Sequence, residues 1–175
     1  MSDERAQESP AAATSRRHFI AGATVMGLGA KGAIAAGAGT PEVASQAWFE
    51  AYLAAFNRAD EAVFGSYYTD DIQFFGQAAQ VTGRQAVLDF YRKVREHLQE
   101  RVELLTYVGD PARQHALAVI RTTLTAHRDW PDMPTGPLKA GDRRESVSFV
   151  MYDIKDGRFS RVRSARFSPQ KGRAA

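Results

Sequence analysis

Three tyrosines, Tyr52, Tyr68 and Tyr91, are the residues of this sequence best suited to act on a small molecule. Tyr52 and Tyr91 fall on the apolar faces of two segments with helical spacing, and Tyr68 follows a short helix between them. A buried tyrosine hydroxyl needs a hydrogen-bond partner, and three together can satisfy one another and leave one donor free. We expect them to line one pocket; three core tyrosines satisfied by backbone are the alternative.

Candidates for proton transfer are few. His127 ends a predicted strand at the edge of a long loop, and histidine suits acid–base chemistry near neutral pH. Asp71 precedes the first predicted strand, where an aspartate is also a common turn residue. Arg121 lies mid-strand; facing inward it could bind an anion or pair with Asp71, and facing outward it would lie on the open sheet face.

Apolar walls for this pocket come from aromatic residues near the tyrosines. Phe74 and Phe149 follow from strand alternation if the side that holds Val147, Phe149 and Met151 faces inward, and plain core packing is the alternative. Ser146, Ser148, Val150 and Tyr152 would then lie on the outer face. Three further aromatic residues complete the predicted ligand-binding set: Phe56, Phe90 and Trp130.

Composition excludes several classes of function. The chain has no cysteine, and its four histidines lack the spacing of a metal motif, so we predict neither a metal site nor a cofactor. It has no phosphate-binding loop and no nucleophile elbow. A net charge of +3 is too small to indicate nucleic-acid binding.

The spacing of apolar residues changes along the chain from a helical period to the alternation typical of strands. Helices are predicted from a start at Thr40-Pro41-Glu42 to about 58, over 60–67, and after a capping box at Thr82-Gly-Arg-Gln85. Strands are predicted over 72–75, 101–108, 116–127, 145–154 and 159–167, with one long loop over 128–144 that we interpret as a flap. Helices followed by a run of antiparallel strands indicate an α+β fold with the helices on one face of a curved sheet.

The N-terminus is predicted to be a targeting signal rather than part of the folded domain. Ser15-Arg-Arg-His-Phe-Ile20, followed by an Ala- and Gly-rich run with cleavage zones near Ala35 and Ala38, resembles a twin-arginine export signal. We predict a signal at 1–38, one domain at 39–168, a disordered tail at 169–175, and a periplasmic or secreted protein. Lys31 interrupts the apolar run, which argues against a stable membrane span.

The order of these elements resembles the nuclear transport factor 2-like superfamily, which includes SnoaL-type cyclases and ketosteroid isomerase. The resemblance spans about 42–168 and rests on the following motifs: Tyr52-Leu-Ala-Ala-Phe-Asn-Arg-Ala-Asp60, Tyr68-Thr-Asp-Asp71, Gly83-Arg-Gln-Ala-Val-Leu-Asp-Phe-Tyr91, and Val150-Met151 with Asp156-Gly-Arg158. It implies a cone-shaped, curved antiparallel sheet wrapped around three helices. It also implies that Tyr52 donates to a substrate oxyanion, with Tyr68 and Tyr91 behind it. The isomerase's two acids would fall at Gly76 and Phe149, where this chain has none.

The function implied by the resemblance is an exported protein with a pocket for a small, oxygenated, apolar molecule such as a steroid, polyketide or terpenoid. It would be an isomerase, cyclase or dehydratase without the usual aspartate base, and dimerise through the open sheet face. A non-catalytic binding or dimerisation module of the cell envelope is the alternative, favoured by the two missing acids. A carboxylate or imidazole within reach of Tyr52 would decide between them.

Overall fold

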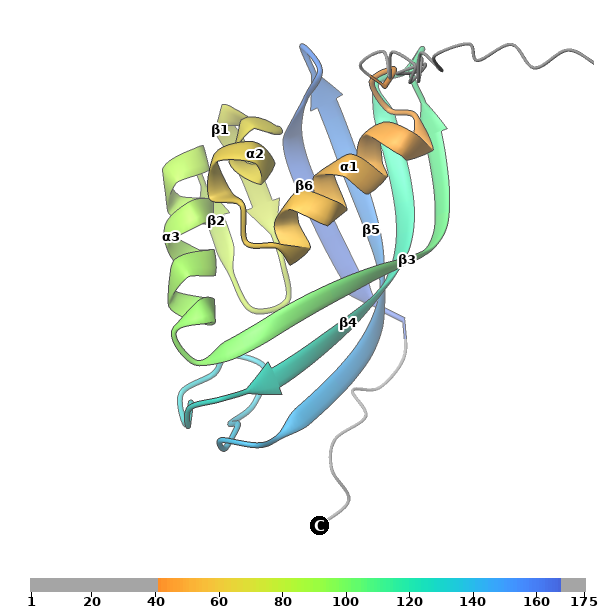
Figure 1. Cartoon of the computed structure of the whole chain (residues 1–175). Coiled ribbons are helices and arrows are strands. Elements are labelled where there is room, and N and C mark those ends of the chain that lie inside the picture. The colour runs from red at the N-terminus through yellow and green to blue at the C-terminus, as the bar shows by residue number, and fades with distance from the viewer. Residues whose placement is uncertain (1–40, 168–175) are drawn as a thin grey trace, which may run out of the picture. The chain divides into compact units, whose positions relative to one another are not determined.

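The computed structural model describes residues 41–167, which fold as three helices and six strands (Figure 1). Their order along the chain confirms the predicted order of helix, short helix, short strand, helix and long strands, and the structure adds the short strand β2, which the predicted strands do not include. The elements are α1 (Gln46–Asn57), α2 (Glu61–Ser66), β1 (Tyr68–Phe75), β2 (Gln80–Thr82), α3 (Arg84–Arg95), β3 (Leu98–Asp110), β4 (His115–Ala126), β5 (Arg143–Lys155) and β6 (Arg158–Arg166).

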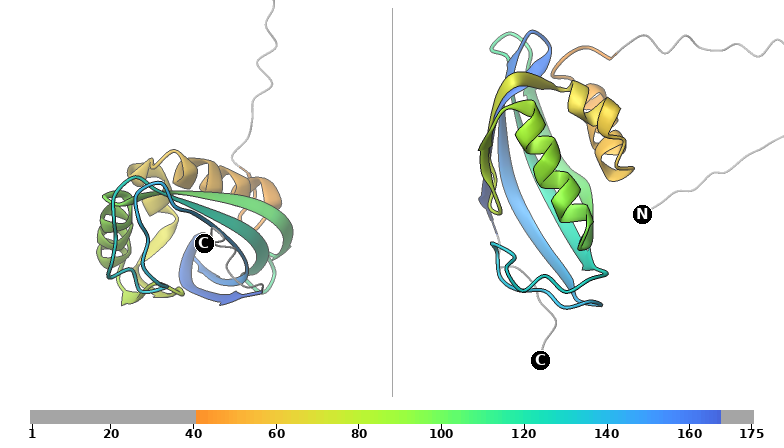
Figure 2. Two further views of the ribbon diagram at one scale, coloured as in Figure 1. Left: turned by 90° about the horizontal axis from the view of Figure 1, so that it is seen from below. Right: turned by 90° about the vertical axis from the view of Figure 1, so that its left-hand side faces the viewer.

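The six strands form one curved sheet in the order β2-β1-β6-β5-β4-β3. The three helices lie on its concave face (Figure 2), as the α+β prediction requires. The four long strands pair antiparallel, but β1 lies parallel to β6, so the sheet is mixed at this one junction. The helices and the concave face therefore share one interior.

The register of the long strands decides which side chains enter that interior. Ile120 of β4 pairs with Ser148 of β5, and Ser148 pairs with Arg166 of β6. Paired residues of neighbouring strands face the same side, so the inner side of β5 carries Ser146, Ser148, Val150 and Tyr152. The prediction that Phe149 faces inward is therefore wrong: its side chain is 48% exposed and packs edge-to-face on Phe167.

Two helix starts differ from the predictions. Helix α1 begins after Ser45, whose hydroxyl accepts from the amide of Trp48 at 3.1 Å, and Thr40 lies outside the described residues. The capping box before α3 is not formed: Gly83 is the N-cap with a φ of 96°, a value that glycine adopts without strain. Asp60, the first residue of the predicted second helix, is the N-cap of α2, and its carboxylate accepts from the backbone amide of Val63.

Aromatic packing joins α1 to the sheet. The rings of Phe49, Phe64, Tyr68 and Phe159 are fully buried, and Phe159 contacts both Trp48 and Tyr52 edge-on, at centroid separations of 4.9 and 5.0 Å. These contacts fix the side of α1 that carries Tyr52 against β6.

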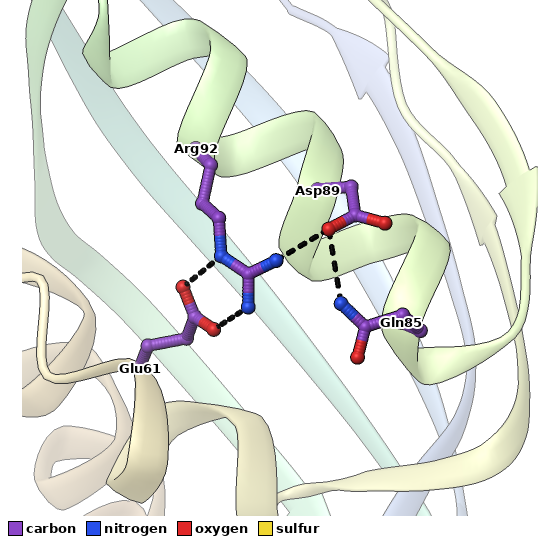
Figure 3. A network of polar contacts seen from close by, with 4 residues as sticks. All are labelled: Glu61, Gln85, Asp89 and Arg92. Atoms are coloured by element: carbon purple, nitrogen blue, oxygen red, sulfur yellow. Dashed lines mark hydrogen bonds and ion pairs between the residues drawn. The ribbon is translucent and has the colours of Figure 1, made fainter.

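Polar contacts at the surface join α2 to α3 (Figure 3). The Arg92 guanidinium donates to both carboxylate oxygens of Glu61 on α2 and to Asp89 on its own helix. Gln85, which was predicted to cap the helix, instead donates to Asp89 at 2.9 Å. The network holds α3 beside the short helix, which orients the face that carries Tyr91.

The predicted signal at 1–38 and tail at 169–175 lie outside the described residues. Of the helices that the structure does describe, none is long and apolar enough to span a membrane.

Candidate functional site

A cavity of about 160 Å³ lies between the concave sheet face, α1, α3 and the loop after β4. Most of its wall is apolar. Its lining consists of Tyr52, Leu53, Phe56, Phe74, Gly76, Gln77, Ala78, Phe90, Tyr91, Val94, Leu98, Glu100, Val102, Ile120, Thr122, Leu124, Trp130, Met133, Thr135, Ser146, Ser148, Val150, Tyr152, Val162, Ser164 and Arg166.

Tyr52 reaches this cavity from α1 and is held from behind by Tyr68. Their hydroxyl oxygens are 2.8 Å apart, and either can be the donor. When Tyr68 donates to Tyr52, the Tyr52 proton is free for a ligand. Burial raises the pKa of both phenols well above the usual range, so both remain neutral donors at physiological pH.

Two further tyrosines line the same cavity. Tyr91 comes from α3 and packs edge-on against Phe56, with ring centroids 4.9 Å apart. Among residues 41–167, it makes no hydrogen bond to Tyr52 or Tyr68, so the expected three-tyrosine network is reduced to one bonded pair. Tyr152, which we had placed on the outer face, contributes a third phenol from β5. Burial also raises the pKa of Tyr91 and Tyr152.

Glu100 is the acid of the cavity, and the sequence interpretation missed it. It lies on β3 beside Leu124 of β4, and both side chains line the cavity. Burial raises the pKa of Glu100 to about 7, while the positive charge of Arg95 opposes the shift. Its negative charge in turn raises the pKa of Tyr52 and Tyr91, so it lies within electrostatic reach of both phenols.

A signal for Glu100 was present in the sequence. Leu98, Glu100, Val102 and Leu104 alternate along β3, and a charged residue at an inward position of such a pattern is a functional candidate. The predicted strand began at 101, three residues after the observed start, so Glu100 was left outside it.

Arg95 lies behind this acid at the end of α3. Its guanidinium packs over the rings of Phe56, Phe64 and Tyr91, at 5.0 to 5.9 Å from their centroids. Cations are attracted to aromatic faces, so these rings hold a positive charge near Glu100.

Five of the seven predicted aromatic ligand-binding residues line the cavity, and Tyr68 and Phe149 do not; the five are Phe56, Phe74, Phe90, Tyr91 and Trp130. Trp130 is buried and stacks on His97, with centroids 4.8 Å apart. Arg144 donates to three loop carbonyls, those of Thr135, Gly136 and Pro137, which holds the loop over the cavity. Their roles in ligand binding stay predictions.

The remaining predicted site residues lie elsewhere. Asp71 and His127 are exposed and are absent from the cavity wall. Arg121 faces the outer side of β4, where it pairs with Glu103 at 2.6 Å and Glu145 at 3.6 Å, rather than with Asp71. Phe149 faces the same side. Arg121 and Phe149 lie in predicted strands, but the register turns their side chains away from the cavity. Asp71 lies inside β1, which begins four residues before the predicted strand, and His127 follows the end of β4.

The two positions matched to the isomerase's acids also differ from one another. Gly76 lines the cavity, but a Cβ there would lie 2.5 Å from the ring of Phe74, so a larger side chain requires that ring to move. Phe149 points outward, so the match of this position to an acid of the isomerase's site is wrong. Within residues 41–167, no cluster of three or more His, Asp or Glu side chains is arranged to hold a metal ion.

The model of the SnoaL-like domain matches residues 49–162, and the chain belongs to this family. This range lies inside the predicted domain and contains Tyr52, Tyr91 and Glu100. No curated protein sequence matches the chain significantly.

Solved structures share the fold at low identity. A proposed polyketide cyclase of Pseudomonas putida is 20% identical, with a TM-score of 0.59 and coverage of 67% of this chain and 86% of that one. A SnoaL-like polyketide cyclase of Agrobacterium tumefaciens is 21% identical, with a TM-score of 0.54 and coverage of 67% and 87%. An LEH-like epoxide hydrolase of M. tuberculosis is 15% identical, with a TM-score of 0.53 and coverage of 67% and 78%. These likenesses establish the architecture.

Proposed function

We propose that this protein binds a small apolar molecule with a carbonyl or hydroxyl oxygen and moves a proton on it, as an isomerase, cyclase or dehydratase. Tyr52 is the hydrogen-bond donor, and Glu100 is the proton-transfer group. The observation that carries the proposal is that one carboxyl group shares a largely apolar cavity with neutral phenols. The SnoaL-like family and its cyclase and hydrolase neighbours support small-molecule chemistry of this kind.

The proposed reaction needs two groups that act on different atoms. The substrate oxygen accepts a hydrogen bond from Tyr52, while the Glu100 carboxylate removes a proton from a carbon next to the carbonyl. The electron pair of the broken C–H bond forms an enolate, and Tyr52 stabilises the charge on its oxygen. Protonated Glu100 then returns the proton to another carbon. A pKa of about 7 suits a group that must both accept and release a proton near neutral pH.

The test uses a six-membered cyclic β,γ-unsaturated ketone, whose conversion to the conjugated isomer is followed by ultraviolet absorbance. Glu100→Gln is expected to lower kcat/KM by roughly 10²- to 10⁴-fold, and Tyr52→Phe by about 10²- to 10³-fold. The wild-type kcat/KM should rise with pH and level off above about 7, because the base must be ionised. Glu103→Gln, which changes an outward carboxylate of the same strand, is the control and should keep the wild-type rate. A wild-type rate in Glu100→Gln would eliminate Glu100 as the base.

A binding module without turnover is the second candidate, and Gly76 favours it because the isomerase's base is missing there. In that case wild type and Glu100→Gln would both bind para-nitrophenol, Tyr52→Phe would bind it more weakly, and the ketone would not be converted.

We also propose that the protein is exported by the twin-arginine route to the periplasm or medium.

We further propose a homodimer through the outer sheet face. Leu117 pairs with Met151, and Val119 pairs with Phe149, so these four apolar side chains form one outward patch. Leu117 and Phe149 are 52% and 48% exposed. Sedimentation should show a dimer for wild type and a monomer for Leu117→Glu/Phe149→Glu.

A further inference from the structure

Two charged side chains line a cavity whose other described lining residues are neutral: Glu100 and Arg166. Arg166 lies near the end of β6, in register with Ser148 and through it with Ile120. Since Ser148 and Ile120 face the cavity, their row places Arg166 on the same side. Arg166 is itself an exposed residue, so the cavity is acidic at Glu100 and basic at a solvent-facing edge.

Arg166 is accompanied by hydrogen-bond donors. We call Gln77, Ser146, Ser148, Ser164 and Arg166 the polar wall, and all five line the cavity. Ser148 is only 6% exposed, and its hydroxyl oxygen accepts from the amide of Gln77 at 3.0 Å. The hydroxyl proton of Ser148 is consequently available to another acceptor.

The charge of Arg166 has no acidic partner among the residues that the structure describes. By contrast, Arg161 and Arg163 of the same strand point to the outer face and pair with Asp153, at 3.7 and 2.7 Å. A guanidinium with neighbouring hydroxyl donors and no carboxylate of its own suits a carboxylate ligand, which can accept two parallel hydrogen bonds from arginine.

The polar wall is well separated from Glu100. Glu100 and Leu104 both face inward on β3, and Leu104 belongs to the row of Ile120, Ser148 and Arg166. The two charges are thus four residues apart along the strands, about 13 Å, and three strand spacings apart across the sheet, about 14 Å before curvature is counted. Arg95, not Arg166, is the cation that lowers the pKa of Glu100. One ligand can meet both ends only if it is elongated.

The volume limits the width of that ligand. A cavity of about 160 Å³ is close to the roughly 150 Å³ that accommodates a benzene molecule in another protein. The apolar body that fits is about one ring, rather than the four fused rings of a steroid.

We propose that the ligand is an elongated organic anion whose apolar body is about one ring wide, with its oxygen function at Tyr52 and Glu100 and its carboxylate carried on a chain that reaches the polar wall. This inference rests on the proposed function, because it assigns the second end of the same site. It makes Arg166 a specificity-determining residue: it selects acids over the matching neutral molecules.

The test compares acids with their methyl esters by calorimetry at fixed ionic strength. The probes are ω-(para-hydroxyphenyl)alkanoic acids with chains of three, five and eight carbons, whose phenol mimics the oxygen function and whose carboxylate lies at increasing distance from it. Wild type should bind at least one acid on the order of tenfold or more tightly than its ester, which is typical of a charge-assisted hydrogen bond. Arg166→Gln should bring the ratio near one, and Arg166→Lys should keep part of it.

Arg158→Gln is the matched control, because it removes the same charge from the other end of β6. It should keep the wild-type ratio, and thermal unfolding confirms that each variant is folded. Tyr52→Phe should weaken acid and ester equally, which tests the proposed function separately. The inference is overturned if wild type binds acid and ester equally, if it binds neither, or if Arg158→Gln lowers the ratio as much as Arg166→Gln. Arg166→Gln could lose the preference for acids while Tyr52→Phe has no effect. That outcome would support carboxylate binding at the polar wall and refute the donor role of Tyr52.

Discussion

The two faces of the curved sheet use the same residue types in opposite ways. On β3, Glu100 faces inward and its pKa is raised to about 7, whereas Glu103 faces outward and pairs with Arg121. Among the phenylalanines, Phe159 is fully buried and Phe149 is 48% exposed. The difference is one of environment, since the helices cover the inner face (Figure 2), whereas the outer face lets charges pair in solvent. Residue type alone therefore identifies neither the acid of the site nor its walls.

The largest contrast should appear when one phenylalanine on each face is truncated. Phe159→Ala removes a ring that packs on Trp48, Tyr52 and Tyr152, and should lower the free energy of unfolding by roughly 3–5 kcal/mol. In the monomer, Phe149→Ala removes a half-exposed ring and should cost less than about 1 kcal/mol. Urea denaturation of both changes, each made in the Leu117→Glu background that should prevent dimerisation, measures the two values. Equal losses in this background would contradict the comparison between the two faces.

A second contrast concerns pH. The folded-state pKa of Glu100 lies near 7, above the ordinary value of 4.5, so the native state holds more protons than the unfolded state between these values. Stability should therefore fall as the pH rises through this window, and level off above it. Relative to Glu100→Gln, wild type should lose on the order of 1–3 kcal/mol across the window. Urea denaturation at a series of pH values measures the difference.

The matched control for this pH dependence is Glu103→Gln, which removes an outward carboxylate from the same strand. It should retain the wild-type slope in this window. If Glu100→Gln retains the slope as well, Glu100 titrates in water and the cavity does not raise its pKa.

The smallest effect is expected for the ion pair on the outer face. A double-mutant cycle with Arg121→Gln and Glu103→Gln should give a coupling energy below about 1 kcal/mol, because both side chains are partly solvated. The coupling should fall further in high salt. A coupling energy of several kcal/mol would instead indicate that this ion pair lies in a buried interface.

The sequence predicted the helices and strands well, but the side chains of the site less evenly. Tyr52, Phe56 and Tyr91 were found because helical spacing marks one face, and that face packs on the sheet. Phe149 was misplaced because β5 carries apolar residues on both sides, so alternation does not specify which side faces inward. Glu100 was missed because the observed strand starts three residues before the predicted one.

What the sequence determined by itself is the order of the elements, the α+β class and the helical faces, since these follow from local periodicity, caps and turns. The tertiary structure decided the register of β3 to β6, and with it which charges face the cavity. Glu100 and Arg166 line the same cavity although their strands, β3 and β6, lie far apart in the chain. The two strands are connected in the sheet through β4 and β5. No local pattern encodes such a meeting, because register depends on the packing of all the strands together.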